Sequence, residues 1–140
     1  SRVPPILTPH PGEFVRLAGG KVDEVVAHKI ERAREAAVEW NAMLVLKGPP
    51  TAIATPNGDV YLHVGGNTAL AHGGSGDVLA GLIGGLWGGG AEALEAACVG
   101  IYVHGKVSEV LTEQAAQRGI LPGDLLEAIP RVFRELESLT

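Results

Sequence analysis

The chain has 140 residues, of which 46% are hydrophobic and 19% charged, and its net charge is −5. This composition is typical of a globular protein rather than a disordered one. The acidic balance, with only 4% aromatic residues, argues against nucleic acid as a partner. A single cysteine, Cys98, excludes an intrachain disulfide, and no apolar run reaches the length that crosses a bilayer. We therefore expect a cytoplasmic protein without membrane partners.

The first half of the chain predicts strands and helices in alternation. Residues 3–7 indicate a short strand that ends in a rigid proline-containing loop, and residues 13–17 indicate the start of a helix. Residues 43–46 form a continuous apolar run, which favours a central parallel strand covered on both faces. Asn57-Gly58 between two β-type runs indicates a hairpin. A helix over residues 22–41 is predicted from an apolar stripe at helical spacing, formed by Val22, Val26, Ile30, Ala33, Ala37 and Trp40.

The second half of the chain begins with a glycine-rich segment, and helices are predicted for most of the residues that follow. A helix near Asp77 is expected to be buried through Val78, Leu79, Leu82, Ile83 and Leu86. On the same helix, Ala80, Gly81, Gly84 and Gly85 are expected to permit close packing against a neighbour. Residues 91–116 predict one long helix, and residues 122–124 the start of a last one. This order predicts an α/β fold with a mainly parallel sheet, in which residues 1–140 belong to a single domain.

The glycine-rich segment at residues 73–77 has the features of a phosphate site. Free backbone amides and the helix dipole attract anions at a helix N-terminus, and glycines let an anion approach closely. Two interpretations of Asp77 remain open: an acid that interacts favourably with the helix dipole, or a general base held beside the phosphate. The segment matches neither a P-loop nor a G-x-G-x-x-G motif.

Two further loops follow predicted strands, where α/β proteins place ligand contacts. In the first loop, "TPHPGE", two interpretations of His10 remain open: it caps a helix or packs against the protein, or it contacts a ligand. If His10 has a structural role, Glu13 is an ordinary acid in the first turn of a helix. In the second loop, "LKGPPT", Lys47 is either a snorkelling lysine at the end of a strand or a cation that faces a phosphate. We expect both loops to converge with residues 73–77 on one crevice.

Three segments, "ILTPHPGEFVRL", "LVLKGPPTAIATPNGDVYLHVGGN" and "HGGSGDVLAGLIGGL", together closely resemble the ADP- or ATP-dependent NAD(P)H-hydrate dehydratase family of the ribokinase-like superfamily. The resemblance runs over essentially the whole chain. It implies a three-layer α/β fold with a mainly parallel sheet flanked by helices. It also implies a lyase that repairs a metabolite: the enzyme phosphorylates the ring hydroxyl of the S-form of NADH-hydrate or NADPH-hydrate with ADP or ATP, and loss of phosphate then restores the dinucleotide.

The resemblance also implies roles for particular residues. Asp77 would take the proton of the hydroxyl, and the catalytic amides would be those of Gly74, Ser75 and Gly76. The hydrated dinucleotide would be bound by His10, Asn67 and Asp77. The nucleotide would be bound by Lys47, Gly48, Pro49, Pro50, Thr51 and Gly76. Glu13 would act on Mg²⁺ through water, as in the superfamily's Asn-x-x-Glu motif with His10 in place of Asn.

The chain departs from this family in two ways. His72 stands where the family commonly has Thr. Family domains are about twice this long, so the resemblance implies that the N-terminal half is missing here. We therefore expect the C-terminal part of a dehydratase domain, which assembles with that half or as a homo-oligomer. Two alternatives stay open: a related small-molecule kinase of hydroxymethylpyrimidine, thiazole or pyridoxal type, and an inactive nucleotide-binding fragment that needs a partner chain. The kinases have Asn where this chain has His10.

Overall fold

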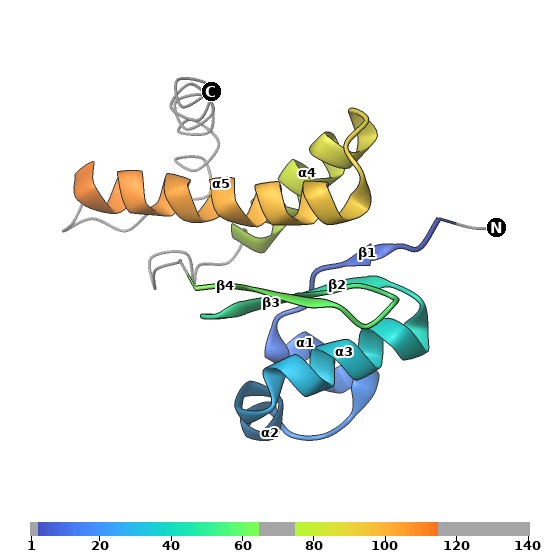
Figure 1. Cartoon of the computed structure of the whole chain (residues 1–140). Helices are drawn as coiled ribbons and strands as arrows, with labels where there is room; N and C mark the ends of the chain where they lie inside the picture. The colour runs from blue at the N-terminus through green and yellow to red at the C-terminus, as the bar shows by residue number, and fades with distance from the viewer. Residues whose placement is uncertain (1–2, 65–74, 115–140) are drawn as a thin grey trace. The chain divides into compact units, whose positions relative to one another are not determined.

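The computed structural model of the chain describes residues 3–64 and 75–114 (Figure 1). The chain divides into two compact units, Ser1–Val64 and Gly65–Thr140. Within the described ranges, no helix combines the length and the apolar character that a membrane crossing requires. The first unit contains a sheet with three helices, and the described part of the second unit consists of two helices. That all 140 residues belong to one domain stays a prediction.

The sheet of the first unit is mixed. Its order is β1 (Ile6–Leu7), β2 (Met43–Leu46), β3 (Thr51–Ala54) and β4 (Val60–His63). β1 and β2 are parallel, whereas β2–β3 and β3–β4 are antiparallel. In this part of the chain the sheet thus differs from the mainly parallel one that we expected. Helices separate β1 from β2 and supply a crossover, but the connections on either side of β3 are too short for one, because a crossover needs about a dozen residues.

Three helices of the first unit lie on one face of its sheet (Figure 1). They are α1 (Pro11–Ala18), α2 (Val22–Ala27) and α3 (Lys29–Trp40). The predicted helix over residues 22–41 is therefore two helices, which are separated at His28, where φ is −121° and ψ is 39°. Its apolar stripe is wrong in the first half, because Val22 and Val26 are exposed and Val25 is buried in their place.

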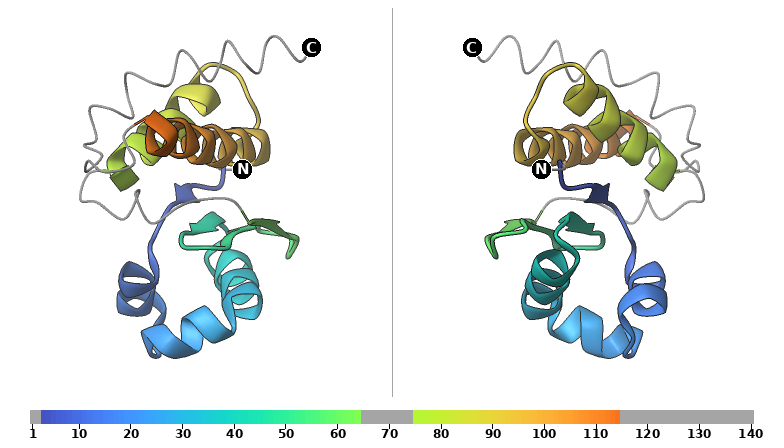
Figure 2. Two further views of the ribbon diagram at one scale, coloured as in Figure 1. Left: turned by 90° about the vertical axis from the view of Figure 1, so that its left-hand side faces the viewer. Right: turned by 90° about the vertical axis from the view of Figure 1, so that its right-hand side faces the viewer.

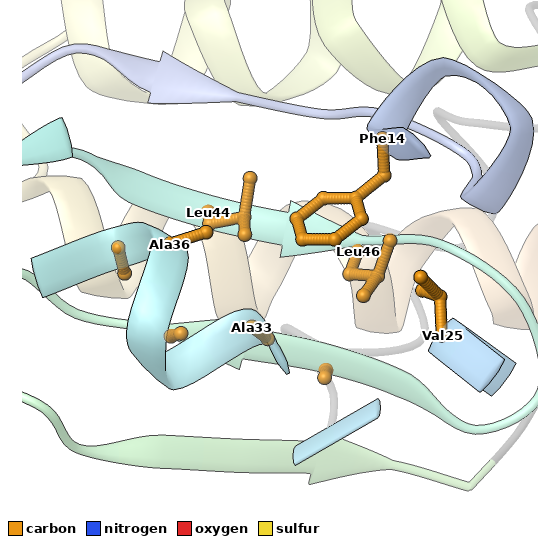
Figure 3. Packing of buried hydrophobic residues seen from close by; sticks show 9 residues of the cluster. Phe14, Val25, Ala33, Ala36, Leu44 and Leu46 are labelled. Carbon is orange, nitrogen blue, oxygen red and sulfur yellow. The ribbon is translucent and has the colours of Figure 1, made fainter. Parts of the chain in front are cut away.

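The core of the first unit lies between α1–α3 and the sheet, as Figure 3 shows. Phe14, Leu44 and Leu46 are the largest side chains of this core, and small residues of α3 let the helix approach β2 and β3 closely. All four residues of β2 are buried, although adjacent side chains of a strand point to opposite faces. The expectation of a central, buried strand is confirmed, but the strand is parallel to β1 alone and antiparallel to β3.

The hairpin between β3 and β4 turns at Asn57-Gly58, as the sequence predicts. The Thr55 amide donates to the Asp59 carbonyl at 2.8 Å, and the Gly58 amide donates to the Thr55 carbonyl at 3.0 Å. From α3, Arg34 Nε donates to the carbonyl oxygen of Gly58 at 2.9 Å. This bond joins the tip of the hairpin to the helix that covers the sheet.

The described part of the second unit consists of α4 (Ser75–Gly88) and α5 (Ala93–Gln114), which pack against each other (Figure 2). Leu79 and Ile83 of α4 are buried as expected, and Val78, Leu82 and Leu86 are partly buried. The long helix over residues 91–116 is confirmed within about two residues at each end. The last predicted helix, starting at residues 122–124, lies outside the described residues.

The close approach of α4 and α5 comes from a glycine that the sequence analysis did not single out. A Cβ atom at Gly100 of α5 would lie 2.6 Å from Cγ1 of Ile83. The expectation that small residues of α4 permit the packing is wrong, because these residues are exposed: Ala80, Gly81, Gly84 and Gly85. A Cβ atom at any of these three glycines would meet nothing within 4 Å.

Candidate functional site

His10 and Glu13 form a reciprocal cap at the N-terminus of α1. Nδ1 of His10 accepts a hydrogen bond from the Glu13 amide at 3.1 Å, and the His10 amide donates to Oε1 of Glu13 at 3.1 Å. Pro11 occupies the first helical position, where a missing N–H costs nothing. The capping interpretation of His10 is therefore confirmed, and its contact with a dinucleotide stays a prediction. Nδ1 of His10 offers an acceptor as an Asn side chain would, so it can fill an N-cap position that Asn also favours.

The contacts between His10 and Glu13 also affect the ionisation of Glu13. Nε2 of His10 lies 3.3 Å from Oε1 of Glu13, and both side chains are about half exposed. The hydrogen bond from the His10 backbone lowers the pKa of Glu13. Partial burial acts in the opposite direction, and the nearby cations Lys47 and Arg16 lower this pKa further. Glu13 is thus a carboxylate at neutral pH.

The two loops that follow β1 and β2 lie side by side, because these strands are parallel neighbours in the sheet. The Lys47 amide donates to the carbonyl oxygen of Pro9 at 2.9 Å, which joins one loop directly to the other. Within the Lys47 loop, Thr51 Oγ1 donates to the carbonyl oxygen of Gly48 at 3.0 Å. The predicted convergence is confirmed for these two of the three segments.

Lys29 is a polar residue of this region that the sequence analysis missed. Its side chain is buried, and Nζ donates to the carbonyl oxygens of Pro50 at 2.8 Å and Lys47 at 3.4 Å. Burial lowers the pKa of the Lys29 ammonium. A signal was present in the sequence, because Lys29 lies four residues from both Val25 and Ala33, on the stripe that is buried. The predicted stripe passes through Ile30, which is exposed, whereas lysines are rarely buried in proteins.

The third predicted segment belongs to the second unit. Ser75, Gly76 and Asp77 form the first turn of α4, so the expected helix start is confirmed. Gly74 and Asn67 lie outside the described residues, as does His72. The convergence of this segment with the two loops of the first unit stays a prediction.

Among the described residues, Glu13 fits an indirect role toward Mg²⁺. No group of three or more His, Cys, Asp and Glu side chains within residues 3–64 and 75–114 could hold a metal ion. Glu13 offers a single ionised and half-exposed carboxylate. Mg²⁺ commonly keeps several of its waters, and a lone carboxylate can accept hydrogen bonds from such waters without displacing them. The donor set therefore agrees with the expected action of Glu13 through water.

Solved structures first define the class of protein. The chain superposes with a TM-score of 0.81, at 25% identity, on a ribokinase-like superfamily protein from Enterococcus faecalis, over 93% of this chain and 44% of the other. It superposes with a TM-score of 0.89, at 41% identity, on ADP/ATP-dependent NAD(P)H-hydrate dehydratase from Bacillus subtilis co-crystallised with ATP/Mg²⁺, over 94% of this chain and 48% of the other. The described fold is thus part of a ribokinase-like fold.

The family follows from the sequence comparisons. A family model described as NAD(P)H-hydrate dehydratase matches residues 1–131. The bifunctional NAD(P)H-hydrate repair enzyme of Moorella thermoacetica is 46% identical over 135 residues, which make up 96% of this chain and 26% of that protein. The chain belongs to the NAD(P)H-hydrate dehydratase family. It spans about a quarter of the Moorella protein and about half of the Bacillus one.

Proposed function

We propose that this chain carries the base and part of the nucleotide site of an ADP- or ATP-dependent NAD(P)H-hydrate dehydratase, which acts on the S-form of the hydrate. One observation supports this most directly: the capped His10–Glu13 pair and the Lys47 loop are joined by the bond from the Lys47 amide to the Pro9 carbonyl. Two of the family's motifs therefore form one surface in this chain. Family membership supplies the reaction for which that surface is suited.

Asp77 takes the proton of the ring hydroxyl, and the hydroxyl oxygen attacks the terminal phosphoryl group of the nucleotide. With ADP, AMP then leaves. Phosphate departs from the ring with the electrons of the C–O bond, and loss of a proton from the adjacent ring carbon restores the double bond. The amides of Gly74, Ser75 and Gly76 stabilise charge on the transferring phosphoryl group.

The two loops of the first unit bind and orient the reactants. His10 and Asn67 contact the hydrated dinucleotide, and the AMP portion of the nucleotide lies along Lys47–Thr51 and Gly76. Glu13 would hold Mg²⁺ indirectly, through a water, and the ion when bound would neutralise charge on the phosphates. The lowered pKa of Glu13 supports this role, because a carboxylate accepts hydrogen bonds from metal-bound water through both oxygens.

The remaining parts of the proposal concern assembly and location. Because the chain spans about half of the Bacillus enzyme, the site is completed by the N-terminal half of a dehydratase domain or by another copy of the chain. All 140 residues then belong to one domain. A cytoplasmic location accords with the single cysteine and with a substrate drawn from the NADH and NADPH pools.

The test supplies hydrated NADH, ADP and Mg²⁺ to the polypeptide as its gene encodes it, and follows the return of NADH absorbance. We expect recovery with the wild-type protein and none with Asp77→Asn. Asp23→Asn is the matched control, because Asp23 is an exposed acid in the first turn of α2. No recovery with the wild-type protein, or full recovery with Asp77→Asn, would refute the proposal. A stable phosphorylated product from a pyrimidine, thiazole or pyridoxal alcohol would indicate the kinase instead.

A further inference from the structure

The side chain of Lys29, from α3, contacts the loop at residues 47–50. The nucleotide-binding role proposed above for this loop does not involve Lys29. The ammonium group donates to carbonyl oxygens at both ends of the loop, at 2.8 Å to Pro50 and 3.4 Å to Lys47. The loop backbone leaves little room above it, since a Cβ atom at Gly48 would lie 2.9 Å from Nζ. Gly48 also has a φ of +119°, which disfavours any residue with a side chain.

These bonds decide where the loop's own donor points. Proline has no N–H, so Gly48 carries the one amide N–H of the segment Gly48-Pro49-Pro50. In a planar trans peptide the C=O and N–H groups point in opposite directions. Because the Lys47 carbonyl is directed at Nζ of Lys29, the Gly48 N–H points away from Lys29.

We propose that Lys29 is a positioning residue for the nucleotide: its ammonium group fixes the Lys47–Gly48 and Pro50–Thr51 peptides, and thereby aims the Gly48 N–H at the bound AMP portion. The inference rests on the proposed function for the identity of that ligand. Lys29 touches neither substrate and acts through the loop. The lowered pKa of this lysine accords with a buried ammonium, and a charged donor holds a carbonyl more strongly than a neutral one does.

The chain offers a matched control on the same helix. Arg34 also lies on α3 and also donates to a loop carbonyl, that of Gly58 at 2.9 Å, but its loop is the β3–β4 hairpin. Arg34→Met therefore removes the same kind of bond from a loop outside the candidate site. Lys29→Met removes both donor and charge, and Lys29→Arg restores both.

The experiment measures the dissociation constant of ADP by calorimetry, and separately KM and kcat in the dehydratase assay, for the full polypeptide and these variants. We expect Lys29→Met to weaken ADP binding and raise KM for ADP by about tenfold or more, with little change in kcat or in KM for hydrated NADH. Lys29→Arg should recover most of the affinity, and Arg34→Met should match the wild type in both constants. A variant that was merely less stable would lose active protein, which lowers kcat and leaves KM unchanged.

Unchanged ADP affinity in Lys29→Met, an equal loss in Arg34→Met, or a wild-type protein that binds no ADP would overturn the inference. If the affinities follow the expected pattern while NADH absorbance never returns, only the proposed dehydratase function fails. Should Lys29→Met not fold, Lys29→Gln takes its place, because it keeps a shorter, uncharged donor. The same outcomes then decide.

Discussion

The imidazole of His10 lies over the backbone of Gly12 so closely that a Cβ atom at residue 12 would be 2.9 Å from its Cε1 and 3.1 Å from its Nδ1. The glycine of His-Pro-Gly-Glu is therefore required by the packing of the His10 ring, and no ligand is needed to explain it. His10 caps the helix, Pro11 starts it, Gly12 makes room for the ring, and Glu13 closes the cap.

Gly12→Ala should displace the His10 ring and break its bond to the Glu13 amide. Nδ1 is an acceptor in that bond, so the proton of the neutral ring is on Nε2 in the wild type. Imidazole ¹⁵N NMR shifts should report this tautomer in the wild type and a mixture in Gly12→Ala. Stability alone would understate the effect, because Ala is favoured over Gly in helices by up to about 1 kcal/mol. An unchanged tautomer would show that the ring tolerates the methyl group.

His10→Asn should separate the cap from the imidazole. Asn is among the best N-cap residues, so the free energy of unfolding should stay within about 0.5 kcal/mol of the wild type, whereas His10→Ala should lose about 1 kcal/mol. If the ring also contacts the dinucleotide, both variants should raise KM for hydrated NADH to a similar extent. Urea unfolding and steady-state kinetics measure the two effects. If His10→Asn had the KM of the wild type, the imidazole would serve only to cap the helix.

Glu13→Gln should likewise separate charge from capping. Gln can complete a capping box as Glu does, so this variant should fold about as well as the wild type, and Glu13→Ala should not. Losing the carboxylate should raise the Mg²⁺ concentration needed for half-maximal activity in both variants. A magnesium titration of the dehydratase assay measures this. If only Glu13→Ala required more Mg²⁺, the cap rather than the charge would be responsible.

The buried ammonium of Lys29 should make stability depend on pH in the alkaline range. Burial lowers its folded pKa from the ordinary value of 10.5, so between the two values the unfolded chain binds more protons. The free energy of unfolding from this group should therefore rise with pH across that window and stay constant below it. The measurement is the difference in unfolding free energy between the wild type and Lys29→Met, from about pH 7 to about pH 10.5. Parallel curves for the two proteins would contradict the burial of the charge.

Gly100→Ala should destabilise the pair of α4 and α5. The added methyl group would lie 2.6 Å from Cγ1 of Ile83, and such overpacking typically costs about 1–3 kcal/mol. Ile83→Ala should destabilise by leaving a cavity, and the double variant should be more stable than the sum of the two single effects, because the new methyl group occupies vacated space. Denaturant unfolding of all four proteins completes the cycle. Additive effects would mean that the two residues do not meet.

The sequence predicted those features of the fold that depend on local signals. Asn57-Gly58 specified the hairpin, and the unbroken apolar run at residues 43–46 specified the buried strand. What depends on partners far along the chain was missed. Lys29 occupies a core position because carbonyl oxygens about 20 residues away satisfy its donors, and no helical pattern encodes that.

In the candidate site, too, some features could be predicted from the sequence and others could not. The resemblance named His10, Glu13 and Lys47, and the parallel pairing of β1 with β2 brings their loops together. That His10 would serve as the cap could be argued from its place before Pro11, but the choice between cap and ligand contact depends on side-chain geometry. The prediction that small residues of α4 permit close packing failed because their spacing does not reveal which face of α4 meets α5. Gly100 of α5 provides the close contact instead.

The bond from the Lys47 amide to the Pro9 carbonyl has a practical consequence for mutagenesis. It joins the two loops through main-chain atoms alone, so an alanine scan of either loop would leave it in place and would record these positions as independent. An ester in place of the Lys47 amide removes the donor and keeps the side chain. Such a change to the backbone tests whether the loop at residues 8–13 and the loop at residues 47–50 act as one unit.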